Sequence, residues 1–273
     1  VVAMEEGCGY KETADAKNGK ILYGYDLIGQ IWKDRPELSK EPAFALDIQY
    51  TGETTGSKLD RIRKVMEECG ATTHILTTLD DICWTLNIRG NDIEFFPLVL
   101  SYAIITKEQV RLYIDASKLN DEIKKNFEED GITLHPYDAV YADVEGLSDE
   151  EILLIDPAKL NYALYSNIPE NVKKVERSNP EVLFKAMKNP TEVENIRKAE
   201  IKDSVAHVRF MKWLKENVGK TKITEISASD KLNEFRREMG NFIRPSFEPI
   251  SSFGEHAAIV HYTSSPETDV ERW

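Results

Sequence analysis

Cysteine is scarce in this sequence, and long apolar runs are absent. The 273 residues include three cysteines, Cys8, Cys69 and Cys83, which have no metal-ligand spacing and cannot all pair with one another. Reduced thiols in a cytoplasm fit this pattern best. The longest mostly apolar run, residues 95–105, contains a proline and is shorter than the roughly 20 residues of a membrane-spanning helix. The sequence therefore predicts a cytoplasmic protein that does not cross a membrane.

Positive charge is also in deficit. The chain has 35 lysines and arginines against 48 aspartates and glutamates, a formal net charge of −13 at pH 7. Binding to nucleic acid needs clustered Lys and Arg to neutralise phosphates, so this balance argues against a nucleic-acid partner. The acidic residues are spread along the chain, for example in residues 126–130 and 147–151, and indicate a solvated surface.

Motifs that form an active site by themselves are missing. The sequence contains no glycine-rich phosphate loop, nucleophile elbow, HExxH or CxxC. Its first residues have neither the basic end nor the apolar core of a signal peptide. Position 1 is valine rather than methionine, which indicates an excised or processed piece of a longer protein.

Five histidines are the main candidates for chemistry. His74 lies in a predicted strand and His207 on a predicted helix, so structural or surface roles suit both. His135 precedes a proline in a predicted loop. His256 and His261 lie in the stretch "SSFGEHAAIVHYTSS", where no neighbouring residue completes a site. From the residues alone, the purpose of this closing stretch stays open.

Apolar periodicity predicts an α/β domain in the first part of the chain, because helix patterns alternate with strand patterns. Ser57 is the expected N-cap of the first clear helix. Asp80 and Asp81, in the first turn of the next helix, are expected to point apart and to interact with its positive end. The helices are expected at residues 57–70, 79–87, 117–131 and 181–187, the strands at residues 73–78, 98–106 and 110–115, and further apolar runs lie at residues 151–157 and 161–168.

A different pattern begins near residues 188–190. Pro190 opens a predicted helix that ends near Gly219. Two apolar stripes on this helix indicate that it is covered on two sides. Asp203 interrupts the first stripe, where we expect it to bind an arginine or a backbone group. The first stripe comprises Ile196, Ala199, Ala206, Phe210, Trp213 and Leu214, and the second comprises Ile201, Val205 and Val208. A helix at residues 223–240 and strands at residues 247–253 and 257–262 are predicted to follow.

Five stretches carry a family resemblance. They are "IWKDRPELSKEP", "SKLDRIRKVM", "LDDICWTLNIRGNDIEFFPLVLSYAIIT", "KNPTEVENIRKAEIKDSVAHVRFMKWL" and "SFEPISSFGEHAAIVHY". Together they resemble the three-domain Xaa-Pro aminopeptidases, the aminopeptidase P family of the creatinase-like, pita-bread metallopeptidases. The resemblance runs in order from about residue 26 to residue 269, and "IWKDRP" and "WTLNIRGNDI" are its most specific blocks. The first twenty or so residues match no such block.

The resemblance implies an α/β fold in three parts. Residues 1–48 would be the tail of a first creatinase-like N-terminal domain. Residues 49–188 would be a second such domain, a mixed sheet flanked by helices. Residues 189–273 would be the opening part of a pita-bread α+β catalytic domain, which is incomplete at this length.

The resemblance also implies a metal-dependent hydrolase. Members of the family remove the N-terminal residue that precedes proline, so peptides with proline in second position would be the substrates. Two divalent metal ions, usually manganese, would be held by two Asp, one His and two Glu, all expected beyond residue 273. Residues 1–273 would then hold no catalytic metal and would be inactive by themselves. We expect a cytoplasmic homodimer without nucleic-acid or membrane partners.

His261 is the candidate catalytic and substrate-binding residue. It matches the histidine of the family's "HY" block, which lies beside the metals and contacts the substrate backbone. Cleavage before proline places negative charge on a carbonyl oxygen, where a histidine can donate a hydrogen bond or pass a proton. The chain departs from the family at "GEHAA", where His256 and Ala257 replace the Asn and Gly of a Gly-Pro-Asn-Gly-like turn. We interpret His256 as a surface turn residue and Arg89 as part of a structural ion pair.

A non-catalytic binding module is the alternative function. The histone-chaperone subunit that keeps this fold without the metals represents that class, and the acidic balance of the chain would suit histone binding. The "IWKDRP" and "HY" blocks resemble the enzymes instead. The five metal ligands expected after residue 273 would discriminate between the two functions.

Overall fold

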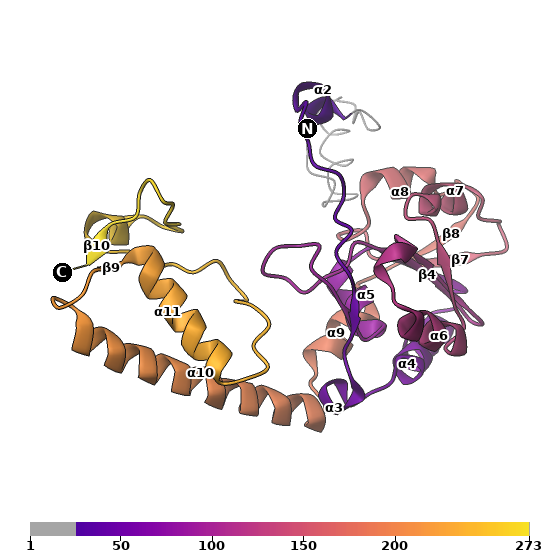
Figure 1. The fold of residues 1–273 in the computed structure, drawn as a ribbon. Helices are drawn as coiled ribbons and strands as arrows, with labels where there is room; N and C mark the ends of the chain where they lie inside the picture. The colour runs from indigo at the N-terminus through magenta and orange to yellow at the C-terminus, as the bar shows by residue number, and fades with distance from the viewer. Residues whose placement is uncertain (1–25, 273) are drawn as a thin grey trace. The chain divides into compact units, whose positions relative to one another are not determined.

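The structure, a computed structural model, describes residues 26–272 and divides into two compact units. The first unit ends at Asn189 and the second begins at Pro190 (Figure 1). Cys8 and the first 25 residues of the domain tail expected at residues 1–48 lie outside the described residues. The boundary expected between residues 48 and 49 stays a prediction.

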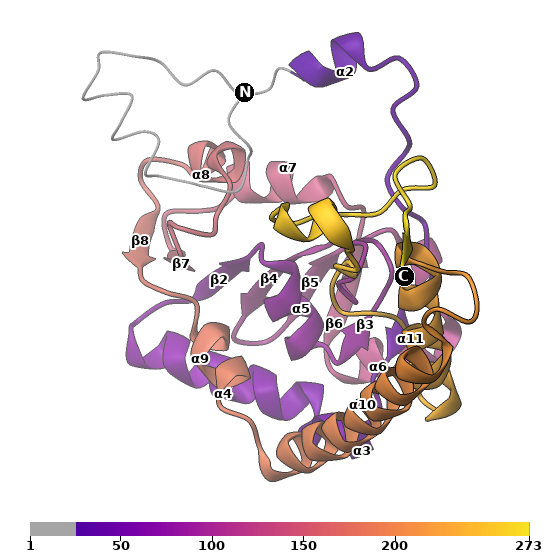
Figure 2. The ribbon, with the colours of Figure 1, turned by 90° about the vertical axis from the view of Figure 1, so that its left-hand side faces the viewer.

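A mixed sheet of six strands forms the centre of the first unit, in the order β6-β5-β4-β2-β7-β8 (Figure 2). β4 runs antiparallel to both of its neighbours, whereas the other adjacent strands are parallel. The predicted α/β fold with a mixed sheet flanked by helices is confirmed. The strands are β2 (Thr73–Leu76), β4 (Tyr102–Thr106), β5 (Val110–Tyr113), β6 (Ile132–His135), β7 (Ile152–Ile155) and β8 (Lys173–Glu176).

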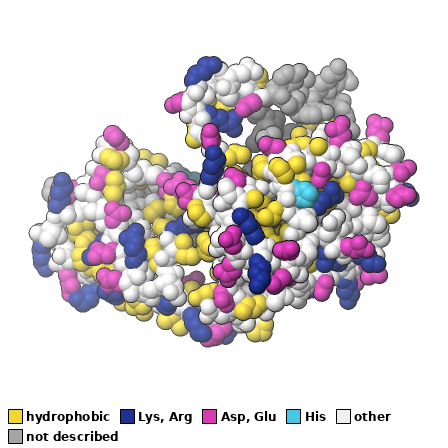
Figure 3. All heavy atoms as spheres, turned by 45° about the vertical axis from the view of Figure 1, so that its right-hand side comes forward, with side chains coloured by type: hydrophobic (Ala, Val, Ile, Leu, Met, Phe, Trp, Pro, Cys, Tyr) yellow, Lys and Arg dark blue, Asp and Glu magenta, His cyan; other side chains and the backbone are white. Residues whose placement is uncertain are grey.

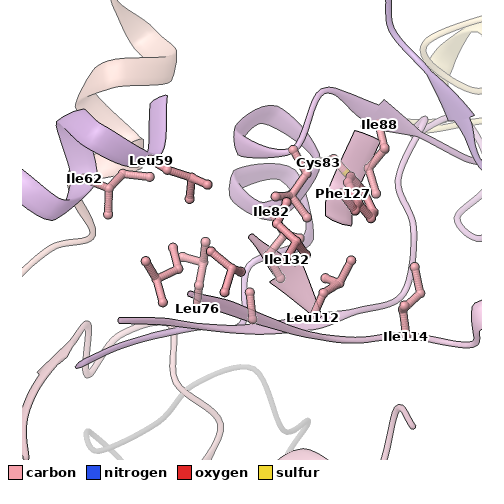
Figure 4. Packing of buried hydrophobic residues seen from close by; sticks show 14 of the residues in the cluster. Leu59, Ile62, Leu76, Ile82, Cys83, Ile88, Leu112, Ile114, Phe127 and Ile132 are labelled. Atoms are coloured by element: carbon pink, nitrogen blue, oxygen red, sulfur yellow. The ribbon is translucent and has the colours of Figure 1, made fainter. Parts of the chain in front are cut away.

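Helices cover both faces of this sheet because successive strand residues point alternately into two apolar layers. Leu76 and Leu112 belong to one layer, whereas Ile75 and Ile104 belong to the other. Figure 4 shows the first layer, where Leu59 of a covering helix lies above the sheet. The first layer is covered by α4 (Thr55–Glu68), α5 (Leu79–Thr85), α6 (Asp121–Glu129) and α9 (Pro180–Ala186), and the second by α7 (Ala139–Glu145) and α8 (Tyr162–Asn167).

Short elements complete the first unit. β1 pairs with β3 in a two-stranded antiparallel ladder beside the main sheet's helices. The short elements are α2 (Leu27–Ile31), β1 (Phe44–Ala45), α3 (Ile48–Thr51), β3 (Ile88–Arg89) and the 3₁₀ helix η1 (Ala116–Lys118).

Two helices begin at residues other than those predicted. The N-cap of α4 is Thr54, whose side chain accepts a hydrogen bond from the Ser57 amide at 3.2 Å. Ser57 therefore lies in the first turn and is not the cap. The N-cap of α6 is Asn120 rather than Ser117, which lies in η1. Ser, Thr and Asn all cap helices well, so neighbouring candidates are hard to separate from sequence.

The carboxylates of Asp80 and Asp81 converge, which contradicts the prediction that they point apart. Both accept hydrogen bonds from Lys185 of α9, and Lys185 Nζ lies 2.7 Å from Asp81 Oδ1. Asp81 is only 1% exposed, so this contact stabilises the packing of α5 against α9. The prediction considered the helix dipole and not a cation contributed by a helix far along the chain.

Acidic and basic side chains are interspersed on the surface. Figure 3 shows both signs of charge scattered over one face, without a large area of one sign. Several exposed ion pairs link them, for example Lys40 with Glu37 and Lys212 with Glu216. This distribution agrees with the expected solvated surface.

A buried ion pair joins β2 to α9. His74 and Glu181 are both 0% exposed, and His74 Nε2 lies 3.3 Å from Glu181 Oε2. His74 Nδ1 lies 2.9 Å from the carbonyl oxygen of Leu154. Burial lowers the pKa of His74, but the Glu181 carboxylate and the Leu154 carbonyl raise it and prevail, so the pKa lies above its ordinary value. His74 therefore has a structural role, as expected.

The second unit contains two antiparallel helices. α10 (Pro190–Asn217) is followed by a turn at Gly219, whose φ is 75°, and then by α11 (Glu225–Glu238). Arg236 Nε binds Asp203 Oδ1 at 2.7 Å, which confirms the arginine partner expected for that aspartate. The unit also contains β9 (Ile223–Thr224), the 3₁₀ helix η2 (Gly254–Ala258) and β10 (Glu271–Arg272), and β9 pairs with β10.

The second unit covers only part of the apolar surface of α10. Ala206 of the first stripe is buried, whereas Ile201 and Val208 of the second stripe are each 65% exposed. Within this unit, the second stripe is therefore uncovered, as expected if the catalytic domain is incomplete at residue 273.

The buried pair of His74 and Glu181 generates a prediction about the pH dependence of stability. Glu181→Gln leaves His74 without a countercharge, so we expect a loss of about 3–5 kcal/mol near pH 6, the usual effect of breaking a buried pair. Because the folded-state pKa of His74 is raised, the stabilisation is fully present below its unfolded pKa of 6.5. It is lost as pH rises through the folded pKa, so the substitution should cost less near pH 9.

Urea-induced unfolding of the 273-residue chain at both pH values would measure this effect. Glu129→Gln is the matched control, because Glu129 pairs with Lys125 on the exposed side of α6 and should contribute less than about 1 kcal/mol. Equal losses for Glu181→Gln at both pH values would contradict the role of the His74 charge.

Candidate functional site

His261 lies in a turn and not in a strand. The predicted strand at residues 257–262 is not formed, because residues up to Ala258 belong to η2. The Ile259 amide donates to the His256 carbonyl at 3.1 Å, so a local hydrogen bond replaces those of a ladder. His261 is exposed, and its φ of 55° is unusual for a residue other than glycine.

The chain on either side of this turn forms a loop that we call the closing loop, residues 251–264. The predicted strand at residues 247–253, which would lead into it, is not formed either. The tip of the loop is apolar and exposed, with Ile259 52% and Val260 83% accessible. Tyr262, by contrast, is only 7% exposed. Side-chain exposure therefore changes abruptly between two consecutive residues: His261 is exposed and Tyr262 is buried.

A buried glutamate at the start of α11 holds the closing loop. Glu225 is 0% exposed, and its carboxylate accepts a hydrogen bond from the Phe253 amide at 2.5 Å. It also accepts hydrogen bonds from the Tyr262 hydroxyl at 2.8 Å and the Ser264 hydroxyl at 3.2 Å. The Glu225 backbone carbonyl accepts from Ser251 Oγ at 2.7 Å. Residues from both ends of the closing loop thus meet at one side chain.

The local sequence explains why a glutamate occupies this position. Thr224 and Ser227 form a capping box at the N-terminus of α11. A carboxylate in the first turn interacts favourably with the positive end of the helix. The pairing of β9 with β10 fixes the residue just before it, and the Glu225 amide donates to the Val270 carbonyl at 3.2 Å. Backbone contacts therefore fix the position of Glu225 independently of the contacts that its side chain makes with the closing loop.

His256 completes the network around Glu225. Its Nδ1 lies 3.2 Å from each carboxylate oxygen. Its ring stacks on that of Tyr262, with centroids 4.5 Å apart. The His256 side chain is 16% exposed, so the interpretation as a surface residue is wrong, although the residue does lie in a turn. The buried Glu225 carboxylate, with which His256 interacts, lies 31 residues earlier in the sequence.

The hydrogen bonds around Glu225 favour its ionised form. Burial raises the pKa of the Glu225 carboxyl, but the Tyr262 hydroxyl, the Phe253 amide and His256 lower it and outweigh burial. The pKa of Glu225 therefore lies below its ordinary value. An ionised carboxylate offers acceptors only, which suits a site where every neighbouring group is a donor.

The remaining candidate residues make contacts with residues close to them in the sequence. His135 Nε2 contacts the Thr133 hydroxyl at 3.0 Å in the first unit. His207 Nδ1 contacts the Asp203 carbonyl, one turn earlier on α10, at 3.0 Å. Arg89 donates to the carbonyls of Cys83 and Ile88 at 2.9 and 2.8 Å, which stabilises the chain between α5 and β3. Each of these residues therefore has a local partner within its own unit.

The described residues do not fit a metal centre. Among residues 26–272, no group of three or more His, Cys, Asp or Glu side chains is arranged to hold a metal ion. We therefore derive no metal-dependent step from this part of the chain.

Among residues 26–272, no helix combines the length and the apolar character needed to cross a membrane.

Sequence reasoning identified His261 but missed Glu225. The donors to Glu225 are dispersed between Ser251 and Ser264, and no short motif connects them with the start of α11. The capping box at Thr224 was an available signal, because it places the following glutamate at a helix N-terminus. It could not reveal that this glutamate is buried.

Comparison with known families assigns both units. The sequence model of the Creatinase/Prolidase N-terminal domain matches residues 34–192, and that of Metallopeptidase family M24 matches residues 194–272. The chain is 36% identical over 249 residues to the probable Xaa-Pro aminopeptidase P of Neurospora crassa, covering 87% of this chain and 36% of that protein. It is 36% identical over 252 residues to Xaa-Pro aminopeptidase 1 of Dictyostelium discoideum, covering 89% of this chain and 40% of that protein.

The fold is also similar to a solved structure. X-prolyl aminopeptidase of Caenorhabditis elegans, described as a cytosolic enzyme with a di-nuclear active site, superposes with a TM-score of 0.92 at 28% identity. The match covers 98% of this chain and 45% of that one. The chain thus spans less than half the length of the relatives it matches.

The Glu225 network generates a prediction about pH. Because the folded-state pKa of Glu225 is lowered, its stabilisation is fully present above the unfolded pKa of about 4.5 and is lost as pH falls through the folded pKa. Protection of the closing-loop amides should therefore decrease between about pH 5 and about pH 3. In Glu225→Gln, protection should be lower at pH 5 and should change little with pH. Hydrogen–deuterium exchange, corrected for intrinsic rates, would measure this, and the same decrease in both proteins would contradict it.

Proposed function

Because the chain belongs to the creatinase/prolidase N-terminal domain family and continues into a match to the M24 metallopeptidases, we propose that the protein acts as an Xaa-Pro aminopeptidase. Its substrates would be peptides with proline in second position, from which it releases the first residue. The similarity to C. elegans X-prolyl aminopeptidase, which extends over 98% of this chain, carries the proposal. The identities of 36% to Xaa-Pro aminopeptidases of N. crassa and D. discoideum also support it.

His261 is the residue of this chain that we propose contacts the substrate. Its exposure leaves the imidazole open to a ligand. A histidine can donate a hydrogen bond to the peptide carbonyl and can pass a proton to the departing proline nitrogen. The exposed Ile259 and Val260 precede it and offer apolar contact to the same peptide.

The metal centre would be completed by residues outside the described range. By its resemblance to the family, the protein would bind two divalent ions, manganese in our proposal, through ligands after residue 273. The di-nuclear active site of the C. elegans relative supports two ions. Metal ions in such sites lower the pKa of bound water and polarise carbonyl groups.

The domain layout and the cellular setting belong to the same proposal. Residues 1–48, 49–188 and 189–273 would be the end of a first domain, a second domain and the start of the catalytic domain. We propose a cytoplasmic enzyme, as the cytosolic C. elegans relative supports. We also propose that the protein is a homodimer, as expected from the family resemblance.

The first test is activity. The full-length protein, supplied with Mn²⁺, should release Arg from an Arg-Pro-Pro peptide, whereas the 273-residue chain alone should release none above a metal-only blank. A full-length protein that binds histones and lacks this activity would instead support the binding-module alternative. Activity of the 273-residue chain alone would refute the expectation that its catalytic centre is incomplete.

The second test concerns His261. His261→Ala in the full-length protein should lower kcat by ~10²–10⁴-fold, the usual effect of losing an acid–base or electrostatic group. Metal content and melting temperature should hardly change, because the side chain is exposed. His207→Ala is the matched control, since His207 is a partly exposed histidine on α10. Preserved turnover with a lower melting temperature would show that His261 has a structural role instead.

A further inference from the structure

The carboxylate of Glu225 is a buried group that the proposed chemistry does not use. Because it is 0% exposed, it cannot itself touch a substrate. Thr224 and Ser227 already cap α11, so the hydrogen bonds to the Glu225 carboxylate are not needed to cap the helix. The additional partners all come from the closing loop.

The partners of Glu225 come from both arms of the closing loop. Phe253 and His256 lie before the exposed tip, whereas Tyr262 and Ser264 lie after it. Ser264 Oγ also donates to the Ser251 carbonyl at 3.0 Å, which links the two arms directly. The carboxylate therefore closes the base of the loop.

His261 lies between this closed base and the exposed tip. Its neighbour Tyr262 donates to Glu225 Oε2 at 2.8 Å and lies 3.2 Å from Thr268 Oγ1. The stacked His256 ring fixes the plane of the Tyr262 ring. With Tyr262 held on one side, the backbone of His261 takes a positive φ. The backbone of His261 is thus constrained by an anchor one residue away.

We propose that Glu225 is a positioning residue of the peptidase reaction, which acts by fixing the closing loop so that His261 meets the substrate in one orientation. This inference rests on the proposed function. A displacement of about 1 Å at a group that contacts the reacting bond can lower the rate by as much as ~10²-fold, so an anchor of this kind affects turnover without touching substrate.

Two substitutions weaken the anchor in different ways. Glu225→Gln keeps the size of the side chain but places an amide nitrogen, a donor, against other donors. Tyr262→Phe keeps the ring that stacks on His256 and removes the hydroxyl that Glu225 accepts. Glu234→Gln is the control, because Glu234 is an exposed glutamate on the same helix that pairs with Lys231.

The experiment compares these substitutions with and without His261 in the full-length, metal-loaded protein. With Arg-Pro-Pro as substrate, Glu225→Gln should lower kcat by about 10- to 100-fold and change KM less, whereas Glu234→Gln should behave like the unsubstituted protein. In the His261→Ala background, Glu225→Gln should lower kcat by no more than about twofold further, because its effect passes through His261. Faster amide exchange should be confined to residues 251–264, at unchanged metal content.

The outcomes separate the inference from the proposed function. No activity in the unsubstituted protein overturns the proposed function and, with it, the positioning role of Glu225. An active enzyme in which Glu225→Gln retains kcat overturns the positioning role alone. Equal losses of kcat with and without His261 also overturn it, because a general structural role would act in both backgrounds. If Glu225→Gln does not fold, Tyr262→Phe decides by the same criteria.

Discussion

A carboxylate that is withdrawn from water needs donors inside the protein, and this constraint organises both units. In the first unit, Glu181 meets His74, and Asp92 lies 2.6 Å from the buried ammonium of Lys118. Each pair joins elements that are distant in sequence. In the second unit, Glu225 gathers several donors from a loop that forms no strand. The buried carboxylates therefore fix tertiary structure where hydrophobic packing alone would leave several arrangements open.

The two kinds of carboxylate differ in how completely they are satisfied. Glu181 Oε1 has no hydrogen-bond partner among the described residues, whereas both oxygens of Glu225 accept hydrogen bonds. An unpaired buried oxygen makes its site depend on a single partner, here His74. A fully paired carboxylate instead distributes the interaction over several groups. The Glu225 network can consequently determine the shape of a whole loop.

The centre of the first unit could be predicted from sequence, because its central strands are largely apolar on both faces and its longer helices follow a helical period. The edge strands β6 and β8, which carry polar and exposed residues, were not predicted. Residues 73–76 and 110–113 form strands within the predicted segments. The closing loop could not be predicted in this way. Residues 257–260 are apolar and suit a strand, but no described strand pairs with them, and local hydrogen bonds form a 3₁₀ turn instead. A short apolar run does not reveal whether a ladder partner exists.

The candidate site shows the same limit at the level of single residues. His261 was found through a resemblance, and its backbone conformation appears only in the structure. A residue other than glycine in the left-handed region costs on the order of 1 kcal/mol or more and persists only where its surroundings impose it. Here the adjacent Tyr262, buried and bonded to Glu225, provides that constraint. The exposed histidine and the buried tyrosine are therefore linked: the burial of Tyr262 constrains the backbone of His261, and the exposure of His261 leaves its imidazole accessible to a ligand.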